Sequence, residues 1–240
     1  EVRSNLRALR DVLKVLGSDW SFVMTDVNTG DPGNEERLAF LFNTRRVHLS
    51  GLACELVVPE DVKSPYAKPA NAFQRQFART PYAVSFLAGG KTFVLVTLHV
   101  LFGKKGEDRR QELEAIAKWL RNWAERMDDY GQNLICLGDF NLDRKGDPQF
   151  EAFTSTGLTP APDHDGLPRT IFDEAGKSDK NSFFDQVAWF QTVKGKPYLT
   201  LKYEGGGNFD FRGLVMPGLT NEQLSYRVSD HLPLWVEFST

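Results

Sequence analysis

Polar residues of catalytic types stand where strand-like apolar stretches of this sequence begin or end. They are His99 in "FVLVTLHV", Asp139 and Asn141 in "LICLGDFN", Asp185 in "DQVAWF", and Asp230 with His231 before "LPLWVEF". Taken singly, a histidine or aspartate at a strand end is more often a cap or a solvated group than a catalytic one. Because functional residues concentrate on strand ends and loops held by a rigid sheet, their joint occurrence predicts one site.

These residue types define the chemistry of such a site. Several carboxylates, an amide and no thiols make a hard, all-oxygen ligand set, which suits Mg²⁺, Mn²⁺ or Ca²⁺ and disfavours a structural zinc. Imidazoles beside it can donate to phosphate oxygens and move protons near neutral pH. Together with a carboxylate that orients water, these groups favour metal-assisted hydrolysis of a phosphoester.

The composition is that of a globular protein. The chain has 240 residues, of which 41% are hydrophobic and 25% charged, and no linker interrupts it, so we expect a single domain over residues 1–240. No apolar run approaches the length of a membrane span. The formal charge of −3 gives no general attraction for nucleic acid, so an anionic substrate needs local positive charge or a bound cation.

The two cysteines, Cys54 and Cys136, both lie inside strand-like apolar runs, which predicts buried, unpaired thiols. Unpaired thiols weakly favour a cytoplasmic location. The chain begins with Glu1 and not with Met, so a targeting segment could have been removed and the compartment stays open. We expect a monomer.

Apolar periodicity predicts the elements that position the polar residues. Helical spacing runs from Val2 to Leu16, closed by Gly17, and again from about Asp108 to Asp129, with a short helix near Pro148 to Thr154. Strands are predicted at 21–27, 37–42, 47–58, 82–87, 92–100, 133–139, 182–190, 198–203 and 233–238. Gly205 to Thr220 is predicted to be a Gly-rich excursion. These elements fit an α/β sandwich, two sheets face to face with helices outside.

Six segments, taken in order, carry a resemblance to a known family. They are "NEERLAFLFN", "FARTPYAVSF", "VLVTLHV", "ICLGDFNLD", "SFFDQVAWF" and "VSDHLPLWVEF". The series resembles the endonuclease/exonuclease/phosphatase superfamily, whose fold is that of pancreatic deoxyribonuclease, and "GDFN" followed by a distant "SDHLP" is specific as a pair. The resemblance covers most of the chain and implies a four-layer α/β sandwich with two mostly antiparallel β-sheets.

The resemblance also implies roles. Asp139 would orient or activate the attacking water, and Asn141 would hold that water or contact phosphate. Asp185 would hydrogen-bond to His231 and orient it, and His231 would act on the scissile phosphate. Such carboxylate–imidazole pairs make physical sense because the carboxylate fixes the tautomer and raises the basicity of the ring.

Four further positions receive roles in the same way. His99 would bind a phosphate oxygen with Glu36 as its carboxylate partner, and Arg79 would lie near the phosphate. Asp230 would be a metal ligand. The family pattern begins with a strand, a helix and a second strand ending in Gln-Glu, whose Glu is the principal metal ligand, and Glu1 resembles that Glu. This implies a domain truncated at its N-terminus, lacking its first strand and helix, unless Glu1 is only an accidental acidic terminus.

Other polar positions have competing interpretations. Lys104, Lys105, Arg109 and Arg110 either supply local positive charge or form a solvated loop and helix start. For His48 and His164 we favour structural or solvent roles. Gly205 to Gly207 could cradle a phosphate, although a mobile loop is the better interpretation.

The sequence thus predicts a divalent-metal-dependent phosphodiesterase, a nuclease acting on DNA or RNA with Mg²⁺ or Mn²⁺, Ca²⁺ being a further possibility. The alternatives are a phosphatase or lipid phosphodiesterase of the inositol phosphate or sphingomyelin type, acting on a small phosphoester, and a catalytically silent binding module. The "AWTDR" signature of inositol-polyphosphate phosphatases is replaced here by "FFDQVAW", which lowers that alternative.

Overall fold

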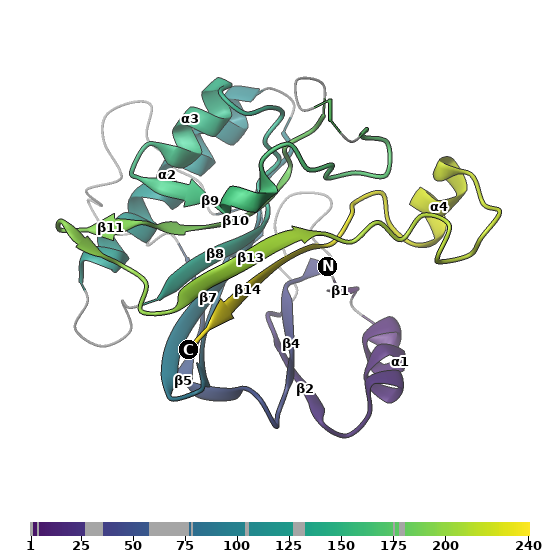
Figure 1. Cartoon of the computed structure of the whole chain (residues 1–240), viewed down its shortest axis with the longest axis horizontal. Helices are drawn as coiled ribbons and strands as arrows, with labels where there is room; N and C mark the ends of the chain where they lie inside the picture. Colours follow the sequence, from purple (N-terminus) through teal and green to yellow (C-terminus); the bar gives the residue numbers. More distant parts are fainter. Residues whose placement is uncertain are drawn as a thin grey trace.

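A mixed sheet of six strands forms the centre of the computed structural model (Figure 1). The structure describes residues 2–3, 5–26, 36–57, 77, 79–103, 106–126, 133–174, 176–177 and 181–240. In spatial order the strands of this sheet are β5 (His48–Glu55), β6 (Tyr82–Ala88), β7 (Lys91–His99), β8 (Leu134–Asp139), β10 (Asp185–Phe190) and β9 (Leu158–Pro160). All neighbours are antiparallel except β7 and β8, which are parallel.

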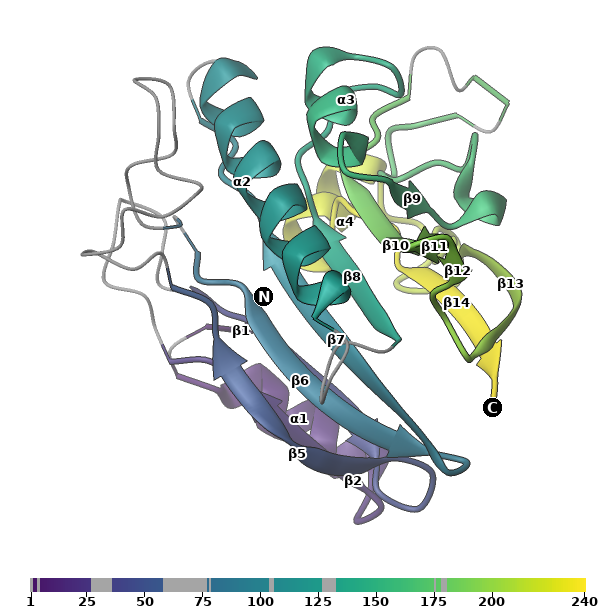
Figure 2. The ribbon, with the colours of Figure 1, turned by 90° about the vertical axis from the view of Figure 1, so that its left-hand side faces the viewer.

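The parallel pair depends on a helical crossover, α2 (Gly106–Glu125), because parallel neighbours cannot be joined by a tight turn. One stripe of α2 is buried against the sheet: Leu113, Ile116, Ala117, Leu120 and Ala124. The short helix α3 (Pro148–Thr154) packs beside it and begins at Asp147, whose side chain accepts a hydrogen bond from the Phe150 N–H. Figure 2 shows both helices on one face of the sheet. The crossover brings the carboxyl ends of β7 and β8 to the same edge.

The opposite face of the sheet is covered by two separate antiparallel pairs of strands. These are β2 (Trp20–Met24) with β4 (Ala39–Asn43), and β13 (Lys202–Asn208) with β14 (Leu234–Ser239). Phe40 of β4 packs edge-on against Phe86 of the large sheet, and Phe238 of β14 packs edge-on against Trp189. Because alternate residues of a strand face opposite sides, β6, β7 and β8 supply both this core and the one under α2.

The α/β class is therefore confirmed. In the described residues the strands that face the large sheet form two pairs, and one continuous second sheet stays a prediction. Outside β2 lies α1 (Arg7–Leu16). The described part of the chain contains no helix long and apolar enough to cross a membrane. Both cysteines are free thiols; Cys136 is buried as predicted, whereas Cys54 is only partly buried.

The predicted helix from Val2 is wrong in its first turn. Val2 and Arg3 form the strand β1, which pairs with β3 (Glu36–Arg37), and the helix begins only at Arg7. The side chain of Asn5 accepts a hydrogen bond from the Arg7 N–H, so it satisfies a donor that the helix start leaves without a partner.

The predicted excursion from Gly205 is also wrong in its first residues, since Gly205 to Asn208 belong to β13. A Cβ on Gly206 would lie 3.0 Å from the Trp235 carbonyl oxygen and 3.0 Å from His164 Nε2, so a residue without a side chain is needed there. The remaining elements were not predicted. They are the strand β9 (Leu158–Pro160), the hairpin β11 (Thr192–Val193) and β12 (Lys196–Pro197), the 3₁₀ turn η1 (Pro162–His164), and α4 (Asn221–Arg227) with a Thr220/Gln223 capping box.

Candidate active site

Three of the predicted residues form one row across neighbouring strands of the large sheet. His99 of β7 is the register partner of Asp139 of β8, and Asp139 is in turn the partner of Asp185 of β10. His99 Nε2 lies 3.6 Å from Asp139 Oδ2. The row stands at the carboxyl ends of the two parallel strands, where an α/β sheet commonly carries its functional groups.

Gly138 makes this close arrangement possible. It has φ +134°, and a Cβ at this position would lie 2.0 Å from the backbone oxygen of Leu98. Only glycine combines that conformation with that approach. The glycine of the "GDFN" segment therefore lets β7 and β8 run side by side up to the row of polar residues.

The loop before β14 completes the cluster. His231 Nδ1 lies 2.6 Å from Asp185 Oδ2, and the Phe184 ring stacks on the imidazole with a centroid separation of 5.7 Å. The Ser229 hydroxyl accepts a hydrogen bond from the His231 N–H. When Nδ1 donates to Asp185, the other ring nitrogen, Nε2, is the one available to a reacting group.

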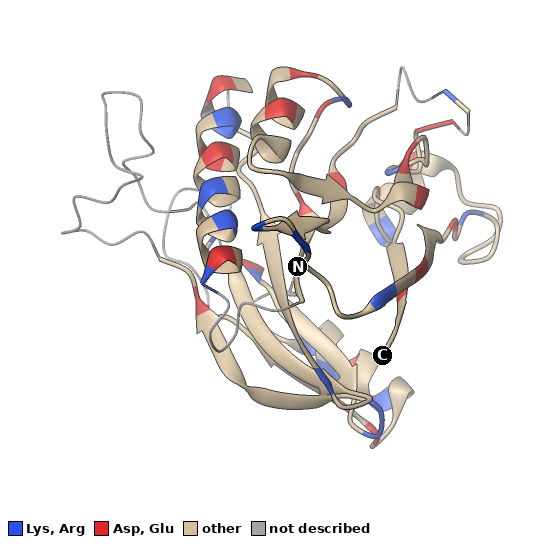
Figure 3. Cartoon of the chain, turned by 60° about the vertical axis from the view of Figure 1, so that its left-hand side comes forward, with Lys and Arg blue, Asp and Glu red and all other residues tan. Residues whose placement is uncertain are grey.

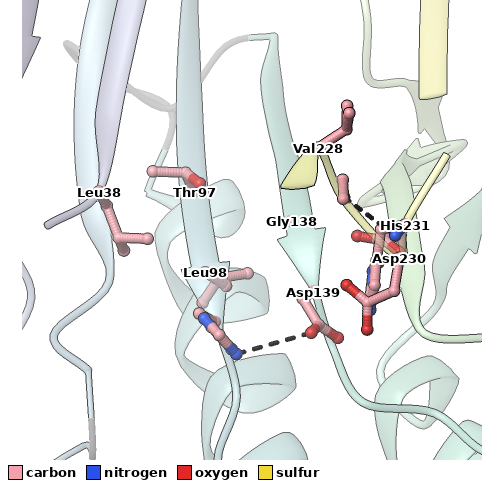
Figure 4. Close-up of a pocket in the computed structure, with 11 residues that line it drawn as sticks. Leu38, Thr97, Leu98, Gly138, Asp139, Val228, Asp230 and His231 are labelled. Carbon is pink, nitrogen blue, oxygen red and sulfur yellow. Dashed lines mark hydrogen bonds and ion pairs between the residues drawn. The ribbon is translucent and has the colours of Figure 1, made fainter. Parts of the chain in front are cut away.

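These residues line a cavity of about 690 Å³ at the edge of the sheet. Figure 4 shows Asp139 next to the loop that carries Asp230 and His231. The described residues that line the cavity are Leu38, Thr97, Leu98, His99, Gly138, Asp139, Asp185, Val228, Ser229, Asp230 and His231. Its size and its polar groups suit a charged substrate better than an apolar ligand.

The cavity is lined by more acidic than basic side chains. The hydrogen bond that His231 donates to Asp185, helped by the charges of Asp185, Asp139 and Asp230, raises the pKa of His231 to about 9 against the opposing effect of burial. Burial and the neighbouring Asp185 raise the pKa of Asp139, although His99 and the Asn141 N–H act in the opposite direction. Crowded carboxylates of this kind favour binding of a positive ion.

Known proteins resemble this chain in sequence or in fold. A deoxyribonuclease from Thioalkalivibrio sp. (strain K90mix) is 26% identical over 244 residues, which cover 96% of this chain and 58% of that protein. An endonuclease/exonuclease/phosphatase family protein from Bacteroides thetaiotaomicron matches with TM-score 0.59 and 15% identity, over 97% of this chain and 78% of that one. D. rerio TDP2, solved with a single strand DNA product, matches with TM-score 0.57 and 13% identity, over 98% and 82%.

This chain has the endonuclease/exonuclease/phosphatase fold. The fold is also called DNase I-like, and its recognition from the sequence motifs is confirmed. No model of a known protein family matches the chain.

Within this fold, Glu36 and Arg79 stand beside His99. Glu36 Oε2 lies 2.8 Å from Arg79 Nε and 3.7 Å from His99 Nδ1. The carboxylate thus bridges a guanidinium and the imidazole, and the side chains of Glu36 and Arg79 are 26% and 15% exposed. Neither residue belongs to the described lining of the cavity.

Asn141 also lies behind the cavity lining. Its N–H donates to Asp139 Oδ1 at 2.8 Å, and its side-chain amide donates to the Val100 carbonyl oxygen at 2.7 Å. Its φ of +51° is a left-handed conformation that asparagine tolerates better than most residues. Asn141 therefore orients the Asp139 carboxylate and ties it to the end of β7.

The donor chemistry of the site fits a divalent cation in part. Asp139 and Asp230 contribute carboxylate oxygens to one cavity, which suits a hard cation. Among the described residues, however, no group of three or more His, Cys, Asp and Glu side chains is arranged to hold a metal ion. Glu1, the second expected ligand, lies outside the described residues.

The other basic candidates near His99 have local partners. Arg109 donates to both carboxylate oxygens of Asp143, at 3.2 and 2.6 Å, and Arg110 bonds to Glu107. Figure 3 shows basic and acidic residues alternating along α2. Arg110 is 42% exposed, which agrees with a solvated helix start, whereas Arg109 is buried at 7% exposure, so its ion pair with Asp143 is a structural contact. Lys104 and Lys105 lie outside the described residues.

The two remaining histidines lie away from the cavity. His48 is exposed on β5, whereas His164 is fully buried with its Nε2 2.9 Å from the Trp235 carbonyl oxygen. Both placements agree with structural or solvent roles.

Sequence reasoning missed Thr97 and Ser229, which line the cavity. Thr97 lies two residues before His99 and so faces the same side of β7, a signal that strand alternation carries. Ser229 directly precedes Asp230 and His231 in the loop before β14.

Proposed function

We propose that this chain is a divalent-metal-dependent phosphodiesterase, a nuclease that hydrolyses DNA or RNA. The observation that carries the proposal is the convergence of His99, Asp139, Asp185 and His231 on one polar cavity from β7, β8, β10 and the loop before β14. This set combines a carboxylate suited to orienting water with two imidazoles suited to phosphate oxygens.

The comparisons support a nucleic acid substrate at a coarse level. The relative that is 26% identical is named a deoxyribonuclease, and the TDP2 structure contains single strand DNA. This chain spans 58% of the length of the deoxyribonuclease, so the activity of that whole protein is carried over only as part of the proposal.

A divalent cation, Mg²⁺ or Mn²⁺, is the proposed cofactor. Asp230 would hold it together with Glu1, as the sequence resemblance implies. When bound, the cation neutralises the charge of the phosphate and polarises its oxygens.

The described side chains have separate tasks in the proposed reaction. The Asp139 carboxylate, oriented by the Asn141 N–H, accepts a hydrogen bond and then a proton from the attacking water. His231, held through Nδ1 by Asp185, presents Nε2 to the scissile phosphate. His99 donates a hydrogen bond to a phosphate oxygen. Glu36, which is itself paired with Arg79, stabilises the charge of the His99 imidazole from the Nδ1 side. The new P–O bond forms to water as the bond to the leaving oxygen breaks, and the leaving oxygen takes up a proton from solvent.

We propose further that the chain is one domain with a four-layer sandwich. The pairs β2–β4 and β13–β14 lie on the same face of the six-stranded sheet, with α1 outside β2 and with α2 and α3 across the large sheet (Figure 2). This arrangement supports two sheets packed face to face with helices outside.

The test is a substrate panel with one matched variant. Supercoiled plasmid, single-stranded DNA, RNA, sphingomyelin and a small phosphomonoester would each be incubated with Mg²⁺, Mn²⁺ or EDTA, using the native chain and Asp139→Ala. Metal-dependent cleavage of a nucleic acid that the variant lacks is the expected result. Phosphate release from the monoester alone, or sphingomyelin cleavage alone, would replace the nuclease assignment. Absence of turnover on every substrate would favour a binding module.

A further inference from the structure

Arg169 is an unusual residue to find in the interior of a domain. Its side chain is 0% exposed and is the largest of the fully buried ones in the described chain. Burial of a guanidinium is costly unless its N–H groups find acceptors. Burial lowers the pKa of Arg169 to about 10, while the charges of Asp185, Asp173 and Asp165 oppose that effect. The contacts of the buried Arg169 side chain therefore need to be explained.

The guanidinium reaches the strand that carries Asp185. Nε donates to the Asp185 carbonyl oxygen at 3.0 Å, and Nη1 donates to the Leu167 carbonyl oxygen at 2.6 Å. The group lies over the Phe183 ring, 4.5 Å from its centroid. Arg169 thus fixes the main chain at the first residue of β10, the residue whose carboxylate holds His231.

The backbone of the same residue reaches the loop that carries His231. The Leu232 N–H donates to the Arg169 carbonyl oxygen, and the Ile171 N–H donates to the Asp230 carbonyl oxygen, both at 2.8 Å. Between these bonds, Thr170 and His231 are antiparallel bridge partners. The segment from Arg169 to Ile171 is therefore paired with the segment from Asp230 to Leu232.

Asp173 holds this segment from the other side. Its Oδ2 accepts hydrogen bonds from the Arg169 and Thr170 N–H groups, each at 2.9 Å, and its Oδ1 accepts one from the Ser182 N–H at 3.2 Å. The turn from Arg169 to Asp173 is thus held by the hydrogen bonds of one carboxylate, and it joins the stretch before β10 to the loop before β14.

We propose that Arg169 is a positioning residue, which sets the geometry between Asp185 and His231 by binding the main chain of one and pairing with the main chain around the other. The two side chains meet at 2.6 Å, a separation that small shifts of either loop would lengthen. Arg169 Nη2 has no hydrogen-bond partner in the described structure, so the buried guanidinium is not fully satisfied.

The first test is independent of activity. A proton in a short Nδ1–H to carboxylate hydrogen bond gives a low-field NMR resonance, which can be assigned by its disappearance in His231→Gln. We expect this resonance in the native chain, and we expect it to be lost or broadened in Arg169→Met, which keeps the length of the side chain. Arg121→Met is the matched control, because Arg121 also stacks on a phenylalanine, Phe190, and donates to a main-chain carbonyl oxygen, that of Thr192. The control should keep the resonance.

The second test rests on the proposed function. With the substrate identified by the panel, Arg169→Met should lower kcat about 10- to 100-fold with little change in KM, and Arg169→Lys should recover part of the loss. In a His231→Ala background, Arg169→Met should cost nothing further, because its effect passes through His231.

The outcomes separate the two proposals. A native resonance and a kcat within about twofold of the native value in a folded Arg169→Met would overturn the positioning role. So would losses that multiply in the double variant. If Arg169→Met fails to fold, Asp173→Asn, which weakens the two bonds to the Arg169 and Thr170 N–H groups, takes its place under the same criteria. If the native chain cleaves no phosphoester, the proposed function fails while the NMR result still decides the role of Arg169.

Discussion

Asp139 and Asp185 are direct register partners on β8 and β10, so the fold sets two carboxylates side by side at the same edge of the sheet. The side chains are 20% and 23% exposed, and solvent screens them only in part. Like charges in such a place oppose folding, and the raised pKa of Asp139 reflects both burial and Asp185. An arrangement that costs stability and gathers polar groups in a cavity is typical of a functional site.

Replacement of Asp139 by Asn should separate stability from activity. The amide keeps the size of the side chain and the acceptor for the Asn141 N–H, but it removes the charge that Asp185 repels. We expect turnover to fall at least about 100-fold, while the free energy of unfolding rises by about 1 kcal/mol. Steady-state kinetics and urea unfolding measure the two effects. A variant that loses stability would show that the carboxylate holds the fold together.

Asp230→Asn should change the cation requirement. Asp230 lines the cavity, and its proposed role is to hold the cation, so the variant should need at least about tenfold more Mg²⁺ for half-maximal activity. Titration of activity with Mg²⁺ measures this. Asp210→Asn is the control, since Asp210 is an exposed carboxylate bound to Arg212 in the same connection between β13 and β14. An unchanged Mg²⁺ dependence in Asp230→Asn would remove Asp230 from the proposed ligands.

The sequence predicted that the residues of the row would lie together because each apolar run begins or stops at a polar residue. The run through Leu98 ends at His99, and the run through Leu137 ends at Asp139. The alternation of apolar residues along each strand then indicates which side chains face the core. The apolar stripe of α2 was visible for the same reason. Local patterns of this kind report the face that a residue buries, but the order of the strands and the parallel pairing of β7 with β8 were not predicted.

Contacts between distant segments had no such signal. Gly206 was interpreted as part of a loop because nothing in a glycine run reports that Trp235 and His164 will pack against it. Arg109 was weighed as a substrate contact because its partner Asp143 lies far along the chain. Arg169 is buried by three segments that meet only after folding, so its role is a tertiary property.

Gly138→Ala should disrupt the site through the backbone. The added Cβ would lie 2.0 Å from the Leu98 carbonyl oxygen, and the φ of +134° is unfavourable for alanine. Both effects force β7 and β8 apart beside His99 and Asp139. We expect a loss of about 3 kcal/mol or more in the free energy of unfolding, measured by urea titration. Gly146→Ala is the control, because Gly146 also has a positive φ but its Cβ would meet no atom within 4 Å. Equal losses in the two variants would mean that strain in φ alone is responsible.

His164 should make stability depend on pH. Its Nε2 bonds to the Trp235 carbonyl oxygen, and its buried Nδ1 has no partner in the described structure. Burial, with a smaller effect from Arg169, lowers the pKa of His164, and Asp163 acts in the opposite direction. Protonation at Nδ1 would therefore place a charge where nothing accepts its proton.

The sign of the effect follows from the lowered pKa. Above about pH 6.5 the imidazole is neutral in both the folded and the unfolded chain, so His164 makes no difference to the free energy of unfolding. As the pH falls below that value, the unfolded chain takes up the proton more readily, and stability declines until the pKa of the folded state is passed. His164→Gln can still donate to the Trp235 carbonyl oxygen but does not titrate. The urea midpoint should therefore fall further between about pH 7.5 and about pH 5.5 in the native chain than in the variant. Parallel declines in the two proteins would assign the acid sensitivity to other groups.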